Sequence, residues 1–208
     1  MGYTVEGFVK RIAPIIVAEC KARGYKYPSA IMAQAILESR SGNSLLAVRY
    51  YNYFGMKCGS KWEGKSVNMT TKEEYAPGCI TVIKDNFRVY NSIEEGIKGY
   101  FDFIATKRYE NLKYAISSRN YLELIKTDGY ATSNTYINNC YALVEKYNLA
   151  FYDIENLEIL SPEVELFDID KAARDVIKGK YGNGDERKQK LGVYYTEVQK
   201  RVNELLKK

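Results

Sequence analysis

The 208-residue chain contains no histidine. This absence excludes Ser-His-Asp and Cys-His catalysis, zinc sites with histidine ligands, and imidazole as a general base near neutral pH. Its four cysteines are too few and too scattered for a disulfide scaffold, although Cys58 and Cys79 could pair outside a cell. We expect neither a metal nor an organic cofactor, so any chemistry must use carboxylates, tyrosines, lysines or cysteines.

The chain also lacks long apolar runs and a strong charge of one sign. No run approaches the 18 residues that span a bilayer, and residues 1–6 show no secretion signal. The net charge of +5 is small and spread along the chain, unlike a nucleic-acid-binding face. We therefore expect a protein that is made in the cytoplasm, binds no nucleic acid and inserts into no membrane. A monomer is favoured.

What is present is typical of a folded protein with a sizeable core. Hydrophobic residues make up 46% of the chain, and 20 residues are tyrosines. The length allows one domain of ordinary size and a small appended one. We place the large domain at 1–152, a linker at 153–166 and a three-helix unit at 167–208.

Apolar spacing predicts a mainly helical large domain. The first helix runs from Val5 to Gly24, with Pro14 as a kink or a restart. The second opens at Pro28-Ser29, with Ser29 as N-cap, and stops at Gly42. Further helices are expected after a capping box at 92–95 and over 111–117, 121–126 and 135–147.

The pattern changes between residues 50 and 90 to short alternating runs broken by glycines. It predicts an antiparallel hairpin with a type II turn at Ala76-Pro77-Gly78-Cys79. In the C-terminal unit, Asp168 and Asp185 are expected to cap the first two helices, and the third is expected to begin at Thr196.

Glu38 is the first candidate for a catalytic group. It follows Ile31, Gln34 and Ala35 on a mostly apolar helix stripe, where desolvation raises a carboxyl pKa. A raised pKa suits a general acid near neutral pH, although a helix-terminal Glu with a solvated head fits the same spacing.

A second carboxylate must come from elsewhere, and Glu73-Glu74 in the hairpin is the best-placed pair. Adjacent strand residues point to opposite faces, so only one of them can face a cleft. Glycosidases use two carboxyls, and tyrosine faces with hydroxyl groups commonly hold sugar rings.

Five ordered motifs in residues 3–152 resemble glycoside hydrolase family 73, the N-acetylglucosaminidases of autolysins and phage endolysins. The matching segments are Ala33 to Ser39, Asn52 to Lys57, Glu74-Tyr75, Phe87 to Tyr90 and Tyr130 to Thr132. The chain departs from the family at Arg40, where Gly is common, and at Ser133-Asn134, where Asp-Pro is common.

The resemblance implies an α+β, lysozyme-like fold, with a helical lobe and a β-hairpin lobe around a glycan groove. It implies Glu38 as the general acid, Glu74 as the second carboxylate and Tyr130 as an active-site residue. The candidate substrate-binding residues are Gln34, Asn52, Tyr53, Phe54, Tyr75 and Tyr136.

The C-terminal unit resembles the CW_7 cell-wall-binding repeat of phage lysins, on segments 172–177, 181–187 and 198–203. That resemblance implies muropeptide binding, for which Tyr181, Asn183 and Arg187 are the candidates. Together the two units suggest a phage endolysin that reaches the wall through a holin-type pore.

The implied activity is endo-acting hydrolysis of the GlcNAc-β-1,4-MurNAc bond of peptidoglycan. Either water activated by Glu74 or the N-acetyl group of the substrate could attack. The alternatives are a muramidase or lytic transglycosylase on the same fold, or a wall-binding protein without activity.

Overall fold

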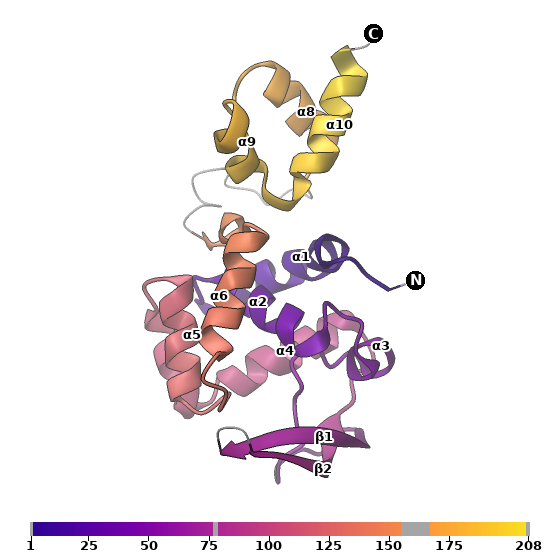
Figure 1. Cartoon of the computed structure of the whole chain (residues 1–208), viewed down its shortest axis with the longest axis vertical. Helices are drawn as coiled ribbons and strands as arrows, with labels where there is room; N and C mark the ends of the chain where they lie inside the picture. Colours follow the sequence, from indigo (N-terminus) through magenta and orange to yellow (C-terminus); the bar gives the residue numbers. More distant parts are fainter. Residues whose placement is uncertain (1, 77–78, 155–166, 207–208) are drawn as a thin grey trace.

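The computed structural model describes residues 2–76, 79–154 and 167–206, and of 71–76 and 79–81 the backbone alone. Figure 1 shows a helical body with a hairpin at one end and a small helical unit at the other. The body contains α1 (Val5–Arg23), α2 (Pro28–Ser39), α3 (Leu45–Tyr50), α4 (Ile93–Ile104), α5 (Ser118–Thr127) and α6 (Tyr136–Lys146), with short 3-10 segments η1 (Lys107–Tyr114) and η2 (Leu149–Tyr152).

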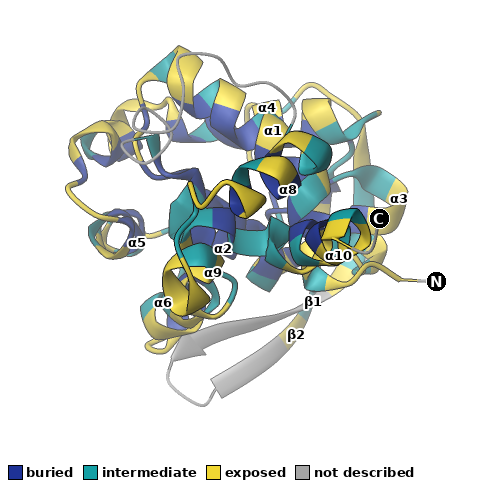
Figure 2. Cartoon of the chain, turned by 90° about the horizontal axis from the view of Figure 1, so that it is seen from above, coloured by how far each residue is buried: buried dark blue, intermediate teal, exposed yellow. Residues whose placement is uncertain are grey.

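The central element of the body is α2. Ten of its twelve residues are buried, and it packs against α1, α5, α6 and η2. The dark blue faces in Figure 2 turn inward around it. A helix that is apolar nearly all round is stable only when neighbours enclose it, which explains its place in the core.

The first helix confirms most of its prediction. Thr4 caps α1 by accepting from the Gly7 amide, and Gly24 ends it with φ of 79°. The helix neither restarts nor breaks at Pro14, contrary to one expectation. Pro14 lies on the exposed face, where the carbonyl that loses its partner can bind water.

The second helix, α2, begins at Pro28 as expected, but both of its expected caps are wrong. Pro28 occupies the first helical turn, so Ser29 lies inside the helix and is no N-cap. The Asp153 carboxylate caps it instead, accepting from the Ser29 amide at 3.0 Å and from its hydroxyl at 2.9 Å. At the other end Arg40, not Gly42, is the C-cap.

A two-stranded antiparallel sheet lies between α3 and α4 in the sequence, as predicted. Strands β1 (Ser66–Ala76) and β2 (Cys79–Arg88) pair from Ser66 with Arg88 to Ala76 with Cys79. The centre of the predicted turn, 77–78, lies outside the described residues. Cys58 carries a free thiol, so the considered Cys58–Cys79 disulfide is not formed.

The remaining helices differ from prediction mainly at their boundaries. Ser92 caps α4 as expected, whereas α3 has no counterpart among the predicted helices. The stretch predicted as a helix over 111–117 is largely the 3-10 segment η1. Together the helical body and the hairpin confirm the α+β, lysozyme-like fold.

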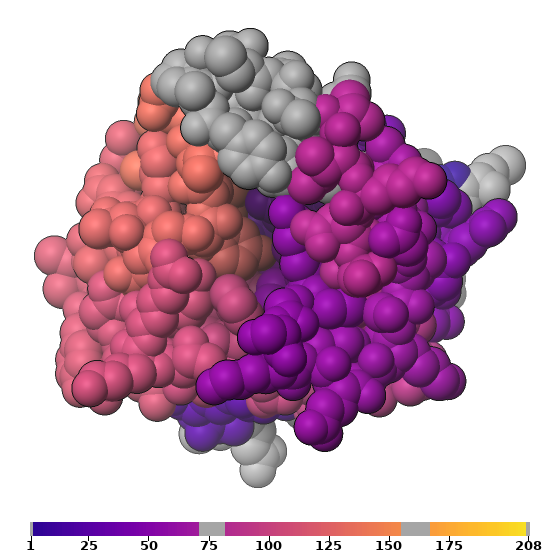
Figure 3. Space-filling view, turned by 90° about the horizontal axis from the view of Figure 1, so that it is seen from below, coloured from indigo at the N-terminus to yellow at the C-terminus, as the bar shows by residue number. Residues whose placement is uncertain are grey.

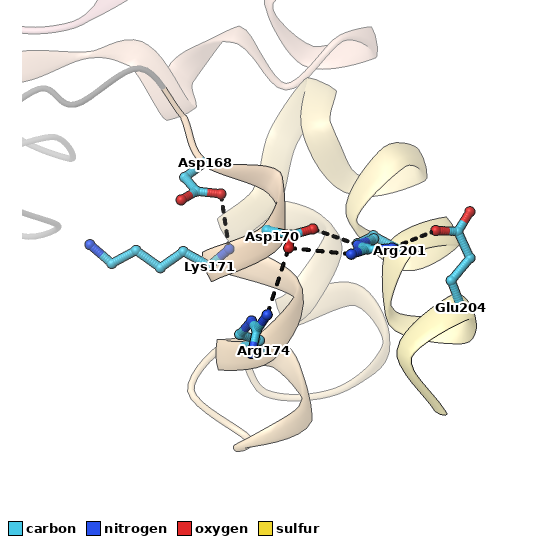
Figure 4. Close-up of polar contacts among 6 residues, drawn as sticks. All are labelled: Asp168, Asp170, Lys171, Arg174, Arg201 and Glu204. Carbon is cyan, nitrogen blue, oxygen red and sulfur yellow. Dashed lines mark hydrogen bonds and ion pairs between the residues drawn. The ribbon is translucent and has the colours of Figure 1, made fainter. Parts of the chain in front are cut away.

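The C-terminal unit contains α8 (Ile169–Ile177), α9 (Gly184–Leu191), a 3-10 turn η3 (Gly192–Tyr194) and α10 (Tyr195–Leu206). Asp168 caps α8 as predicted, but Asp185 lies inside α9, whose N-cap is Asn183. Asp170 accepts from Arg201 at 2.5 and 3.3 Å and thereby joins α8 to α10 (Figure 4). That pair is solvated, so its contribution to stability is small.

The C-terminal unit contacts the body on the side of α1 and η2. Phe151 of η2 lies against Phe167 with ring centroids 6.5 Å apart, and Lys10 of α1 lies over the Tyr194 ring and pairs with Glu197. Asn148 donates to the Gln189 carbonyl at 2.7 Å. In the described part of the chain no helix is long and apolar enough to cross a membrane.

Candidate active site

Glu38 is the last residue but one of α2, and the turn behind it is tightly built. The Ser39 hydroxyl donates to the Ala35 carbonyl at 2.5 Å and accepts from the Gly42 amide at 2.7 Å. Arg40 and Ser41 both have positive φ, of 52° and 56°. Glycine adopts this conformation without cost, which explains why the family commonly has Gly where this chain has Arg40.

The carboxyl of Glu38 reaches the surface but is surrounded by protein. The residue is exposed, yet burial raises its pKa from 4.5 to about 7. These two facts agree for a side chain on the floor of a cleft, where water has access from one side only. Figure 3 shows a hollow between the pink and orange surface of α5 and α6 and the purple surface of residues 40–70.

Three polar side chains near this carboxyl come from the segment 130–140. Burial raises the pKa values of Tyr130 and Tyr136, and the negative charge of Glu38 raises both further. The Cys140 thiol, buried beside them, has a pKa raised to about 12 for the same reasons. Glu38 therefore lies among neutral groups that can donate hydrogen bonds but carry no charge near pH 7.

The position of Tyr130 is set by contacts on both sides of its ring. Its hydroxyl donates to the Phe54 carbonyl at 3.0 Å, and its ring lies 6.2 Å from those of Phe103 and Tyr136. The Gly55 backbone passes close to Glu38: a Cβ atom added at Gly55 would lie 3.8 Å from Glu38 Oε2. The sequence-predicted Glu38, Tyr130 and Phe54 are thus brought together.

Four of the candidate substrate-binding residues lie in the interior instead of on the cleft surface. Gln34, Asn52, Tyr53 and Phe54 are at most 5% exposed. The Asn52 side chain accepts from the Met56 amide and donates to the carbonyls of Met56 and Arg88. In this structure their burial does not fit direct sugar contact; they position the cleft wall. Tyr136 is also only 4% exposed, and the charge of Glu38 acts on its hydroxyl.

Two expected site residues belong to the hairpin, and their side chains are outside the described residues. The backbone places Glu74 opposite Ile80, near the distal end of β1, with Tyr75 next to it. Whether either contacts a substrate therefore stays a prediction.

Sequence reasoning missed the polar role of Tyr100 and Tyr121 and the place of Cys140. Tyr100 lies in α4 and is fully buried. Its hydroxyl donates to Gln34 Oε1 at 2.7 Å and lies 2.9 Å from the Tyr121 hydroxyl. Helical spacing identifies a buried face but cannot show which hydroxyls meet across helices, so no signal in the sequence could have found them.

In the C-terminal unit, the residues expected to bind the wall form one loop cluster. Arg187 donates to the Gly182 carbonyl at 3.1 Å, to Asn183 Oδ1 at 2.9 Å and to Gln199 Oε1 at 3.1 Å. Tyr181 is half-buried against the unit's core. Arg187 thus holds the loop in shape as well as presenting charge.

The raised pKa of Glu38 predicts how activity depends on pH. A general acid must be protonated, so kcat/KM should be highest below pH 7 and fall as pH rises through about 7, where Glu38 loses its proton. The pH profile on purified peptidoglycan checks this. A profile that stays flat to pH 9 would contradict the role of Glu38.

Two family models match the chain. The Glucosaminidase model, described as mannosyl-glycoprotein endo-beta-N-acetylglucosaminidase, matches residues 13–149, and the CW_7 repeat model matches residues 170–206. The chain is 36% identical to the exo-glucosaminidase LytG of Bacillus subtilis over 72% of its length and 54% of the relative. It is 32% identical to a probable N-acetylmuramidase of Lactococcus lactis over 71% of the chain and 35% of that relative.

Among solved structures, the catalytic domain of the autolysin Auto from Listeria monocytogenes superposes with a TM-score of 0.61 at 30% identity, covering 74% of this chain and 90% of that one. The chain spans about half the length of LytG and about a third of the length of the probable N-acetylmuramidase. The match of the Glucosaminidase model over 13–149 includes Glu38, Tyr130, Tyr136 and both strands, and the chain belongs to the glucosaminidase family, with a CW_7 repeat at its C-terminal end.

Proposed function

We propose that the chain is an endo-β-N-acetylglucosaminidase that hydrolyses the GlcNAc-β-1,4-MurNAc bond of bacterial peptidoglycan. The observation that carries the proposal is Glu38: a carboxyl whose pKa burial raises to about 7, so that about half of it is protonated at neutral pH, with neutral tyrosine and cysteine groups near it. Membership of the glucosaminidase family supports the reaction class.

In this proposal Glu38 donates its proton to the departing glycosidic oxygen as the C1–O bond breaks. The resulting positive charge at C1 is stabilised by Glu74 or by the substrate's own N-acetyl group, and water completes the hydrolysis. Tyr130, whose hydroxyl is fixed on the Phe54 carbonyl, orients the sugar beside the acid. The hairpin carries Glu74 as a separate arm from the helical body, so closure over a glycan would complete the site.

The rival activities differ in the bond cleaved or in the position along the glycan. One relative bears the name exo-glucosaminidase and another probable N-acetylmuramidase, so neither endo action nor the glucosaminidase bond follows from the family alone. The matching family model is described as an endo-beta-N-acetylglucosaminidase, which favours endo action.

Endo action predicts an early fall in glycan length. With purified, peptide-free glycan strands, we expect long and intermediate fragments to appear before disaccharides, as in random internal cleavage. Size-exclusion chromatography at several times of digestion measures this. Disaccharide as the first and only product would show exo action, and no new reducing ends would favour the rival that binds without cleaving.

We further propose that the C-terminal repeat retains the enzyme on the wall through the loop held by Arg187. Arg187→Ala removes three hydrogen bonds that shape this loop. Its co-sedimentation with cell walls should weaken about tenfold, while turnover of soluble glycan stays the same. Lys188→Ala, next to it on α9, is the matched control. Equal sedimentation of both variants would contradict this role.

A further inference from the structure

A chain of hydrogen-bonded side chains runs through the core beneath Glu38. The hydroxyls of Tyr121 and Tyr100 are 2.9 Å apart, Tyr100 donates to Gln34 Oε1 at 2.7 Å, and Gln34 Nε2 donates to the Tyr136 hydroxyl at 2.8 Å. All four side chains are at most 4% exposed. Four linked polar groups crossing helices α2, α4, α5 and α6 in a dry core are costly unless each is satisfied.

The hydrogen bonds of this chain have one direction. Gln34 Oε1 can only accept, so the single hydroxyl proton of Tyr100 is used there, and the Tyr100 oxygen must accept from Tyr121. The Tyr136 oxygen accepts from Gln34, so its own proton points away from Gln34. Cys140 lies one helical turn after Tyr136 on α6, and the negative charge of Glu38 raises the pKa values of both groups.

Tyr100 also supports the second tyrosine of the site. Its ring stacks on Phe54 with centroids 4.0 Å apart, and the Phe54 carbonyl is the acceptor for Tyr130. The ring and the hydroxyl of one residue thus support the two tyrosines that flank the acid, although Tyr100 itself is 0% exposed and can touch no substrate.

We propose that Tyr100, assisted by Tyr121, is a positioning residue of this active site: through Gln34 it sets the direction of the Tyr136 hydroxyl, and through Phe54 it holds Tyr130. The proposal rests on the proposed function, because it assigns these contacts to the site of the general acid. The competing explanation is that these hydrogen-bonded side chains only stabilise the core.

The variant Tyr100→Phe separates the two, because it keeps the ring and removes the hydroxyl. The Gln34 amide group can then flip, so that its Oε1 accepts from the Tyr136 hydroxyl. The Tyr136 proton then points toward Gln34, and the negative end of the Tyr136 hydroxyl dipole faces Glu38. The Glu38 carboxylate is then less stabilised, and its pKa should rise by about half a unit. Because the Tyr136 hydroxyl then points away from the site, kcat should fall about fivefold at constant KM.

Tyr25→Phe is the matched control. Tyr25 is buried to the same degree, and its hydroxyl donates to the Ile104 carbonyl at 3.3 Å, outside the chain. It should lose a similar amount of stability without changing the titration of Glu38. Among the described neighbours of Glu38, the groups coupled to it are Tyr130, Tyr136 and Cys140, and burial keeps all three neutral below pH 9, so the midpoint reports Glu38.

The titration is followed by carboxyl-carbon NMR of the full chain, with the Glu38 signal assigned from Glu38→Gln. Because no substrate is needed, the result stands even if the proposed activity fails. A raised midpoint in Tyr100→Phe and an unchanged one in Tyr25→Phe would support the proposal, and identical midpoints in both would overturn it. If Tyr100→Phe does not fold, Tyr121→Phe decides: a smaller rise supports the proposal and no change overturns it.

Discussion

Glu38→Gln should abolish nearly all turnover while the protein remains folded. General acid catalysis contributes about 10²- to 10⁴-fold, and a glutamine amide of the same size cannot donate a proton to a leaving oxygen. The raised pKa of Glu38 means that its ionised form is disfavoured in the folded protein. Replacing it should therefore leave the melting temperature at pH 8 unchanged or higher. Rates on purified peptidoglycan and thermal melts measure the two effects.

The control for this variant is Glu145→Gln, an exposed glutamate on α6. It should keep wild-type rates, since it lies on the solvated face of its helix. If Glu38→Gln retains more than about a tenth of the activity, the general acid is another group and the assignment of the site is wrong.

The second large effect is expected at the hairpin. Glu74→Gln should lower kcat about 10²-fold, because the positive charge that develops at C1 would lose its stabilising carboxylate. Its neighbour Glu73 pairs with Thr81 in the register, and adjacent residues of a strand alternate between its two faces. If Glu74 is the carboxylate that serves the cleft, Glu73→Gln should therefore stay within about twofold of the wild type.

Steady-state kinetics on glycan strands compare the two hairpin variants. Equal effects would mean that the strand face has been assigned wrongly or that neither carboxylate takes part. The stereochemistry of the product adds an independent result: inversion requires direct attack by water, whereas retention excludes it and favours the N-acetyl group.

Much of the helical body could be predicted because its signals are local. The Ser92 cap, Gly24 and the alternating strands depend on neighbours a few residues away, and apolar spacing separates helix from strand. Glu38 was found in the same way, since its place on an apolar stripe predicts a desolvated carboxyl.

What could not be predicted depends on contacts between distant segments. The cap of α2 comes from Asp153, 124 residues further along the chain from Ser29, and this contact displaces the expected N-cap. Gln34 and Asn52 were expected at the sugar surface because they stand in the motifs of the family. Their bonds to Tyr136 and to the Met56 backbone place them inside, where they shape the cleft.

The central claim is that Glu38 acts as the acid in cleavage on the reducing side of N-acetylglucosamine. Digestion of purified peptidoglycan, reduction of the products with borohydride and mass spectrometry of the new ends test it most directly. We predict glucosaminitol ends with the wild type and none with Glu38→Gln. Muramitol or anhydromuramic ends would show that a different bond is cleaved, and glucosaminitol ends formed by Glu38→Gln would show that Glu38 is not the acid.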